Sequence, residues 1–465
     1  MDILGVVIIV LSLLSLMYFA YKGMSVIMIA PVLAMITAFI ATGTNPLYSL
    51  TEDFMPSLVS FVKSYFPLFL VGSIFGKIMG NSGAAKVVAM SLTKYIDDKK
   101  AILIVVLATA ILTYGGVSLF VVVFAVYPIA VELFRKADIP KRLIAPTIAL
   151  GGFTFTMTAL PGTPQSINAI PTKYLGTTIY AAPILGIIAA LVVFGLGMWY
   201  LTRRAKQAEA VSEGYGEHND HIVLHEEDSK LPSVFMSFLP MILVFILNYF
   251  FTWWFFQPNM IEYFTGQYPV DMDAALKVVN PIWPITASIS ISTILGLIVY
   301  KKYISNVNQT LTEGTVGSLL PIFNTGSENG YGGVIKLMPG FATLKTLLIG
   351  LPILPLAQMA LATTCLAAVV GSSSAGTALA LETFGDEFLT LMNTYGIPAE
   401  VVHRVVLLAA GCLDSLPHCG AVITLLTVTH LTHKESYKDI AFNTIVAPII
   451  SVVVVIAFYY VTGLY

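Results

Sequence analysis

Long runs of apolar residues alternate with short polar segments along the whole chain. A helix needs roughly 20 residues to cross a bilayer core about 30 Å thick, and several of the apolar runs approach or exceed that length. We therefore predict an all-α polytopic membrane protein. The predicted spans are residues 3–20, 24–42, 61–79, 178–202, 233–256, 281–300 and 440–462.

Two pairs of apolar arms are too short to cross a bilayer comfortably, and each pair flanks a turn of small and polar residues. The arms 101–113 and 119–134 surround the sequence TYGGVS, with the charged clusters DDKK and RKADIPKR outside them. The arms 355–370 and 379–393 surround GSSSAGTA. We predict two re-entrant helical hairpins, 101–135 and 355–393, that each enter and leave the membrane on one side.

Two further apolar segments are interrupted by proline. Residues 141–176 are interrupted at LPGTPQSIN (160–168), and residues 399–432 are interrupted at LDSLPHCG (413–420). Proline lacks a backbone N–H and clashes with the preceding helical turn, and unwound backbone inside a bilayer is tolerated only where it is buried in protein or lines a cavity. We therefore predict two discontinuous helices whose interruptions are functional.

The two halves of the chain follow the same order and share local sequence. Three matches keep a nearly constant separation: SLTEDF with TLTEGT, Ile139-Pro140 with Ile397-Pro398, and Pro161 with Pro417. Each half is predicted to contain, in order, three membrane spans, a re-entrant hairpin, a broken helix and a final span. We predict two repeats, 1–204 and 233–465, joined by the polar linker 205–232.

The distribution of Lys and Arg predicts the orientation of the chain. The loops 43–53 and 257–280 carry only Lys277, so the other loops belong inside by the positive-inside rule. Both termini are then outside the cytoplasmic membrane, the linker is in the cytoplasm, and the two repeats have inverted topology. Inverted repeats with interrupted helices are typical of secondary transporters that bind substrate at the bilayer midplane. The basic segments are Lys22, Lys94–Lys100, Arg135–Arg142, Arg203–Lys206, Lys301–Lys302 and Lys434–Lys438.

Composition excludes several other classes of protein. The residues are 57% hydrophobic and 11% charged with a net charge of −2, which argues against a nucleic-acid partner. No GxxxxGK[ST] motif for ATP, no GxSxG and no HExxH occur, so we expect neither an enzyme nor a cofactor. The linker histidines His218, His221 and His225 are read as solvated residues rather than metal ligands.

Four helix N-termini are expected to converge on one central region, because a helix begins at each hairpin tip and after each break. Free N–H groups and the helix dipole favour an anion there. No arginine lies in the breaks, so hydroxyl, amide and backbone groups are expected to hold a substrate carboxylate. We predict Ser118, Ser166, Ser374 and Thr377 as N-caps. The remaining candidate substrate-binding residues are Gly115, Gly116, Thr163, Gln165, Asn168, Ser372, Ser373 and Ser415.

Three ionisable residues in apolar segments are candidates for proton coupling. An ionisable group at the bilayer centre costs about 2.5–3.5 kcal/mol on the lenient insertion scale, so it is usually functional. Asp414 and His418 lie in the second break, and histidine titrates near neutral pH. Glu328, in NTGSENGYGG, is a second candidate. A local hydrogen bond that closes the broken turn is the structural alternative for Asp414 and His418.

Four stretches resemble the gluconate:proton symporter (gluconate permease) family of the ion transporter superfamily. They are SIFGKIMGNSGAAKVVA (73–89), YGGVSLFVVVFAVYPIAVELFRKADIPKRLIAP (114–146), GSSSAGTALA (371–380) and DSLPHCGAV (414–422). The resemblance implies proton-coupled import of sugar acids or small hydroxy acids, an elevator-like movement of hairpins and broken helices, and a homodimer in the lipid bilayer.

The first break departs from the gluconate branch of that family. That branch has a motif like PPHPGP where this chain has LPGTPQS (160–166). The chain therefore looks more like the branch that carries short carboxylates such as 3-hydroxybutyrate. Sodium coupling stays open, because unwound carbonyls with Ser, Thr and Asn can coordinate Na⁺. A passive anion channel and an intramembrane serine–histidine enzyme are weaker alternatives.

Overall fold

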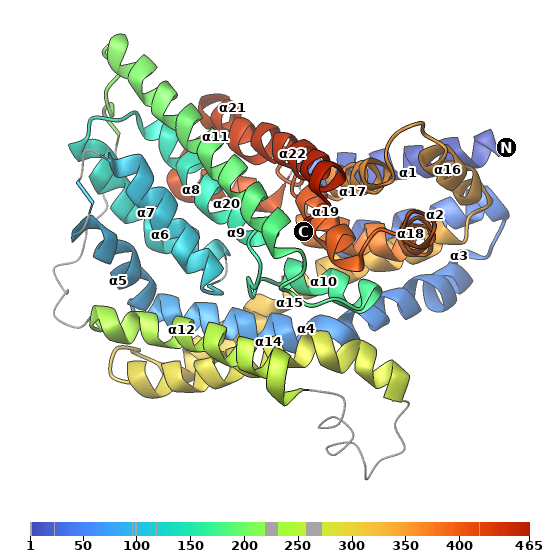
Figure 1. The fold of residues 1–465 in the computed structure, drawn as a ribbon, viewed down its shortest axis with the longest axis horizontal. Coiled ribbons are helices and arrows are strands. Elements are labelled where there is room, and N and C mark those ends of the chain that lie inside the picture. The colour runs from blue at the N-terminus through green and yellow to red at the C-terminus, as the bar shows by residue number, and fades with distance from the viewer. Residues whose placement is uncertain are drawn as a thin grey trace.

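The computed structural model describes residues 2–22, 24–94, 96–97, 100–117, 119–218, 231–256, 272–417 and 419–465. Within these ranges every regular element is a helix, and no strand occurs. Among the same residues, five helical stretches are long and apolar enough to cross a membrane: 46–81, 183–210, 234–255, 282–300 and 433–462. The predicted all-α fold is confirmed (Figure 1).

The first half of the chain forms ten α-helices of more than three residues, together with shorter turns, in its described part. In chain order the elements are α1 Ile3–Tyr21, α2 Val26–Thr42, α3 Pro46–Tyr48, η1 Ser49–Phe54, α4 Met55–Asn81, α5 Ala84–Ser91, η2 Leu92–Lys94, α6 Ala101–Tyr114, α7 Leu119–Lys136, η4 Lys141–Leu143, α8 Ile144–Gly152, α9 Phe155–Thr158, α10 Ser166–Leu175 and α11 Pro183–Ala210.

The second half is likewise built of helices in its described part. Its elements are α12 Val234–Phe250, η6 Phe251–Phe255, α14 Met272–Tyr300, α15 Val307–Lys336, α16 Pro339–Ile349, α17 Pro355–Val370, α18 Ser373–Tyr395, α19 Ala399–Ala410, α20 Gly420–Thr429, α21 His433–Ala441, η7 Phe442–Val446 and α22 Ala447–Thr462. In Figure 1, α4, α12 and α14 run along the lower edge of the molecule. The helix pair α6 and α7 lies at the left of that view, and the pair α17 and α18 lies at the right.

Corresponding helices make corresponding contacts in the two halves. Helix α6 packs on α8 as α17 packs on α19, and α7 packs on α20 as α18 packs on α10. Helix α2 packs on α15 as α14 packs on α4. The partners in the last two comparisons come from opposite halves, so the halves are interlocked. The interrupted helices α8 to α10 and α19 to α20 lie between the two helix pairs (Figure 1).

The long helices α4 and α15 pack closely because α15 carries glycines at the contact. A Cβ added at Gly330 would meet the carbonyl oxygen of Phe54 at 2.9 Å, and one at Gly326 would meet Val62 at 3.3 Å. Small residues let helix backbones approach in lipid, where apolar burial does not drive association. These two glycines therefore serve helix packing.

The structure differs from the sequence-based boundaries in several places. The loop predicted at 43–53 is helical from Pro46, where α3 and η1 lead directly into α4. The linker was predicted to begin at residue 205, but α11 continues to Ala210. The segment RRAKQAEA (203–210) consists of strong helix formers, so polarity alone did not end the helix. The short helices α5 and α16, which follow α4 and α15, were not predicted, because each is shorter than a membrane span.

One group of charged side chains ties the end of α11 to η4 and α21. The guanidinium of Arg142 donates from Nε and Nη2 to the two carboxylate oxygens of Glu213, at 2.7 and 2.9 Å. Its Nη1 donates to Asp439 at 2.9 Å, and Arg204 Nε donates to the same carboxylate at 2.7 Å. The four residues therefore hold three segments together at one end of the bundle.

Candidate functional site

The first interruption, here called break 1, comprises residues 159–165 between α9 and α10. Gly162 takes a positive φ of 77°, a conformation that glycine adopts without steric cost. Its N–H donates to the carbonyl of Ile179 at 2.9 Å. The tyrosine ring of Tyr180 lies against Gly162, where a Cβ would meet it at 2.6 Å. Break 1 is therefore a defined turn rather than a loose loop.

The turn between α6 and α7, here called tip 1, packs on break 1. Gln165 Nε2 donates to the carbonyl of Thr113 at 2.6 Å, and the Tyr114 hydroxyl donates to the carbonyl of Pro161 at 2.8 Å. Gly116 has a φ of 86° and lies close to the ring of Pro164. These contacts bring the predicted residues of tip 1 and break 1 together. Ser118 lies outside the described residues.

The second interruption, here called break 2, comprises residues 411–419 between α19 and α20. The half-buried carboxyl of Asp414 is within hydrogen-bonding reach of the hydroxyls of Ser373 and Ser415. Ser415 in turn donates to the carbonyl of Thr444 at 3.4 Å, and the Tyr437 hydroxyl donates to the Ser415 carbonyl at 3.1 Å. Asp414 is therefore held by neutral hydroxyl groups. His418 lies outside the described residues.

The turn between α17 and α18, here called tip 2, meets break 2 through Ser373.

The predicted N-caps of the helices that begin at tip 2 and at break 1 are wrong. Helix α18 is capped by Ser372, whose side chain accepts from the Ala375 N–H at 3.4 Å. Ser374 and Thr377 lie inside the helix, because α18 starts directly after the left-handed Gly371. In break 1 the N-cap of α10 is Gln165, whose side chain is directed to tip 1, and Ser166 is the first helical residue.

The two interrupted helices meet where α19 crosses the end of α9. A Cβ at Gly411 would touch the Thr158 side chain at 3.1 Å. Arg404 Nη1 donates to the carbonyl of Thr158 at 3.2 Å. His403 lies between Asn168 and Thr177. Its Nε2 is 3.2 Å from the Asn168 Oδ1, and its Nδ1 is 2.7 Å from the Thr177 hydroxyl. The chain therefore joins its two interrupted helices through buried polar contacts.

Sequence reasoning missed His403 and Arg404. Both lie in VVHRVV, a charged or titratable pair within an apolar run, and that signal was available. The signal is weaker than at the interruptions because both residues lie in the regular helix α19, with no proline or turn beside them. Their partners come from the other half of the chain, which local sequence does not show.

Several buried hydroxyl groups at the site lack hydrogen-bond partners. The hydroxyls of Thr163 in break 1, Thr377 in α18 and Thr113 beside tip 1 are buried and unpaired within the described part of the chain. A buried unpaired polar group costs about 1–3 kcal/mol. Such groups are available to a ligand or ion. In contrast, Asn168 uses its amide N–H groups on the carbonyls of Thr163 and Ile179, at 3.1 and 2.9 Å.

Glu328 lies apart from the two breaks, on the long helix α15. It is 3% exposed, and its Oε2 has no hydrogen-bond partner among the described residues. Gly332, one helical turn later on the same face, lies against Leu379 and Thr383 of α18. Glu328 therefore belongs to the face of α15 that packs toward α18.

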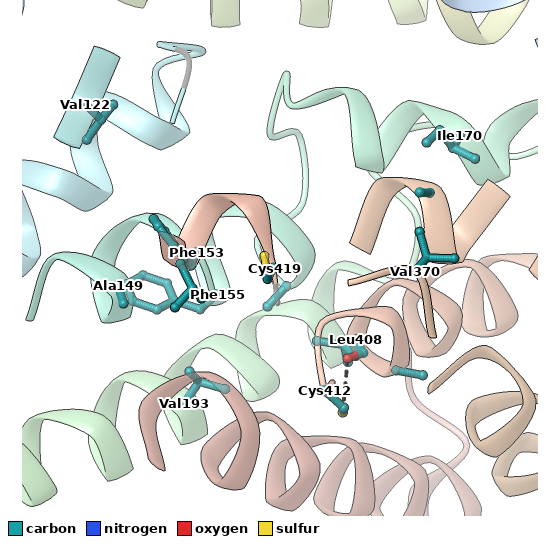
Figure 2. Close-up of a cluster of buried hydrophobic side chains, with 14 of the residues drawn as sticks. Val122, Ala149, Phe153, Phe155, Ile170, Val193, Val370, Leu408, Cys412 and Cys419 are labelled. Atoms are coloured by element: carbon teal, nitrogen blue, oxygen red, sulfur yellow. Dashed lines mark hydrogen bonds between the residues drawn. The ribbon is translucent and has the colours of Figure 1, made fainter. Parts of the chain in front are cut away.

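Apolar side chains pack around the two ends of break 2. Figure 2 shows Cys412 and Cys419 near its two ends, with Leu408 beside the first and Phe153 and Phe155 in the same cluster. The Cys412 thiol donates to the Leu408 carbonyl at 3.3 Å. All five of these side chains are buried, so the two ends of the break are anchored in the apolar core. Within the described residues, no group of three or more His, Cys, Asp or Glu side chains is arranged to hold a metal ion.

Two solved transporter structures share this fold. The YdaH transporter of Alcanivorax borkumensis matches with a TM-score of 0.58 and 15% sequence identity, over 88% of each chain. MtrF of Neisseria gonorrhoeae, described as one of a class of antimetabolite efflux pumps, matches with a TM-score of 0.55 and 14% identity, over 94% of each chain. At such low identity the likeness concerns the fold alone.

Sequence comparison identifies a family and two relatives. The family model of the GntP family permeases matches residues 1–262. The uncharacterized transporter YxjC of Bacillus subtilis is 42% identical over 98% of this chain and 99% of its own length. An uncharacterized transporter of Haemophilus influenzae is 30% identical over 38% of this chain and 40% of its own. The chain therefore belongs to the GntP permease family and is a multi-pass membrane transporter, not an enzyme.

Proposed function

We propose that this transporter imports a small organic anion, a hydroxy-carboxylate or sugar acid, together with protons. Three observations support the proposal: tip 1 packs on break 1, Asp414 in break 2 is within reach of Ser373 in tip 2, and α19 contacts α9 and α10. Thr163 and Thr377 add buried unpaired hydroxyls within the described residues. The helix N-termini at the tips and breaks, together with these hydroxyls, suit a carboxylate. Asp414 supplies a protonatable group among neutral neighbours. The neutral first break favours a short hydroxy acid such as 3-hydroxybutyrate over gluconate.

We assign proton coupling to the second break, to Asp414 with His418 beside it in sequence, and keep Glu328 as the candidate of lower rank. Asp414 contacts the tip of one hairpin through Ser373, so its protonation can alter the contact that opens or closes the site. Glu328 is more deeply buried but lies on a helix outside the breaks. Proton binding at Asp414 would therefore act directly where the substrate is held.

Purified protein in proteoliposomes tests the function and its coupling together. Uptake of labelled 3-hydroxybutyrate and gluconate is measured with an imposed pH gradient, a sodium gradient or neither. The proposal expects saturable uptake that only the pH gradient drives uphill. Uphill uptake driven by sodium alone would favour the second candidate function, a sodium symporter. The unpaired hydroxyl oxygens of Thr163 and Thr377, which could coordinate Na⁺, support that alternative. Linear, non-saturable flux would instead favour an anion channel.

An Asp414→Asn variant separates coupling from binding. Asparagine mimics a protonated carboxyl, so counterflow exchange, which needs no net proton movement, should persist. Accumulation driven by the pH gradient should fall at least tenfold. Glu328→Gln, tested in parallel, should keep most of the accumulation. Full accumulation in Asp414→Asn would end the proposed role of that carboxyl.

We further propose that residues 1–204 and 233–465 are inverted repeats, with both termini outside and the linker inside. The matching helix contacts in the two halves support the repeat. Single cysteines at Asp2 and Lys206, in a cysteine-free background, test the orientation with a membrane-impermeant maleimide on intact cells. The terminal site should react, and the linker-proximal site should react only after permeabilisation. A homodimer, expected from the family resemblance, is tested by the mass of the detergent-solubilised protein.

A further inference from the structure

Arg404 is a fully buried arginine in the middle of α19. Its side chain has 0% exposure. Its Nε and Nη2 donate to the carbonyl of Ala181 at 3.2 and 2.7 Å, and its Nη1 donates to the carbonyl of Thr158 at 3.2 Å. All three bonds go to neutral backbone oxygens. The guanidinium is therefore hydrogen-bonded but not neutralised by these partners.

Arg404 forms no ion pair with any Asp or Glu in the described part of the chain. The ion pairs found there involve other basic residues. A buried charge without a counter-ion is costly, and arginine does not escape the cost by losing its proton. A buried positive charge is less costly when a nearby anion, such as a bound ligand, offsets it. The Arg404 guanidinium is therefore a buried positive charge with no acidic side chain paired to it in the described part of the chain.

The position of Arg404 points to break 1 as the place of that partner. A Cβ added at Gly186 would meet Arg404 Nε at 3.3 Å and the ring of Pro161 at 3.4 Å. The guanidinium and the first proline of the break therefore lie against the same small residue. Tyr114, whose hydroxyl donates to the Pro161 carbonyl, is also an electrostatic neighbour of Arg404. Break 1 itself contains no charged side chain.

We propose that Arg404 is the fixed counter-charge for the substrate carboxylate, acting across the backbone of break 1 without touching the substrate. The inference rests on the proposed function and makes Arg404 a positioning residue. Its planar fork holds Thr158 and Ala181, so the charge stays at one place behind the break. A unit charge several ångströms from an anion, in a medium of effective dielectric near 20, changes affinity roughly tenfold or more.

The test compares a carboxylate with its uncharged counterpart. Binding of 3-hydroxybutyrate, gluconate and 3-hydroxybutyramide to the purified full-length protein is measured by calorimetry for Arg404→Gln, Arg404→Lys and the control Arg203→Gln. Arg203 is exposed near the end of α11. Arg404→Gln should bind carboxylates at least tenfold more weakly, with amide binding unchanged. Arg404→Lys and Arg203→Gln should keep carboxylate binding within about threefold of the wild type at pH 7.

The lysine variant keeps the test valid where Arg404→Gln does not fold. A buried lysine can lose its proton at alkaline pH, whereas arginine cannot. Carboxylate affinity should therefore fall from pH 7 to 9.5 in Arg404→Lys and not in the wild type. Tyr114 on α6 and His403 on α19 are the titratable neighbours, and both proteins share them. An identical pH profile in the two proteins would overturn the inference.

The other outcomes are distinguishable from a failure of the proposed function. Equal loss of carboxylate and amide binding in Arg404→Gln would mean a merely structural arginine. Unchanged carboxylate binding in a folded Arg404→Gln would overturn the counter-charge while leaving the proposed function intact. A wild-type protein that binds none of the carboxylates tested, yet transports another class of compound, would overturn both.

Discussion

At the scale of single residues, His403 links the two interrupted helices. Its ring nitrogens contact Thr177 at 2.7 Å and Asn168 at 3.2 Å, and all three residues are buried. Replacing His403 by Leu leaves the Thr177 hydroxyl and the Asn168 Oδ1 without this partner, and each buried unpaired atom costs about 1–3 kcal/mol. We expect His403→Leu to lower the thermal unfolding temperature in detergent and to reduce transport.

A double-mutant cycle with Thr177→Val isolates the contact. If the bond is real, the two substitutions together should destabilise less than the sum of their separate effects. His218→Leu, at an exposed position, is the control and should leave stability nearly unchanged. Strict additivity of the two buried substitutions would contradict the link.

The Arg142–Glu213 pair gives a second prediction at this scale. The Arg142 guanidinium donates to Glu213 and holds the pKa of that carboxyl below its ordinary value of 4.5. Because the folded pKa is lowered, the pair stabilises the protein above that ordinary value and its contribution is lost as pH falls below it. The Glu213 side chain is 41% exposed, so the contribution is at most about 1 kcal/mol.

Thermal unfolding between pH 7 and pH 3.5 measures this contribution. The wild type should lose slightly more stability over that range than Glu213→Gln, which has no carboxyl to protonate. Glu209→Gln, on the same helix end and outside the charged group, is the control and should follow the wild type. Parallel curves for wild type and Glu213→Gln would show that the pair contributes nothing to folding.

Candidate site residues could be identified from the sequence where a polar or ionisable side chain stands in an apolar segment that is interrupted by proline. Asp414 stood out because a carboxyl in an apolar run is energetically costly, and Gln165 because it is a polar side chain in the first break. Arg404 and His403 are also ionisable side chains in an apolar run but lie in a regular helix, so only three-dimensional contacts reveal their purpose. Those contacts, with Thr158 and Asn168, join distant parts of the chain.

At the scale of elements, the hairpin of α17 and α18 depends on a glycine at its crossing. A Cβ at Gly376 would meet the backbone N of Ala367 at 3.0 Å and still closer atoms of the same residue. Gly385, on the same helix, has nothing within 4 Å of such a Cβ. We expect Gly376→Ala to cost about 1–3 kcal/mol by overpacking.

Gly385→Ala is the matched control, because the same chemical change there only improves helix propensity, by about 0.5–1 kcal/mol. Unfolding temperature and uptake should both fall in the first variant and hold or rise in the second. Equal behaviour of the two variants would mean that the hairpin arms do not approach closely at Gly376.

Helix boundaries could be predicted where a proline or a glycine ends the helix. They were harder to predict where the only signal was a change from apolar to charged residues. The interruptions at Pro161 and Pro417 follow from backbone chemistry that does not depend on context. The end of α11 does not, because Arg, Lys, Gln and Glu are as compatible with a helix as with a linker. The capping position of α18 depends on where Gly371 turns left-handed, a one-residue difference that sequence pattern does not resolve.

At the scale of the whole molecule, an elevator movement requires the hairpins and broken helices to slide against the helices that pack around them. Helix α18 meets α15 at Gly332, where a Cβ would touch Leu379. Within the α4–α15 pair, a Cβ at Gly314 would lie 3.4 Å from the Cβ of Ile74. Disulfides form between Cβ atoms about 3.5–4.5 Å apart. At Gly332 the Leu379→Cys change removes the leucine side-chain atoms that a new Cβ would meet, and at Gly314 a new Cβ would meet Ile74 Cα at 2.8 Å, so α4 and α15 must separate slightly. Both places are close enough to test engineered cysteine pairs.

The pair Gly332→Cys with Leu379→Cys would join a proposed moving helix to a proposed fixed one. In a cysteine-free background, its oxidation should reduce proteoliposome uptake at least tenfold, and reduction should restore it. The pair Gly314→Cys with Ile74→Cys joins two helices of the proposed fixed group, so its oxidation should leave uptake within about twofold. Because both bonds involve α15, general rigidification of that helix would affect both alike. Full uptake with α15 and α18 completely crosslinked would rule out sliding between them and would place the alternating movement elsewhere, within the breaks themselves.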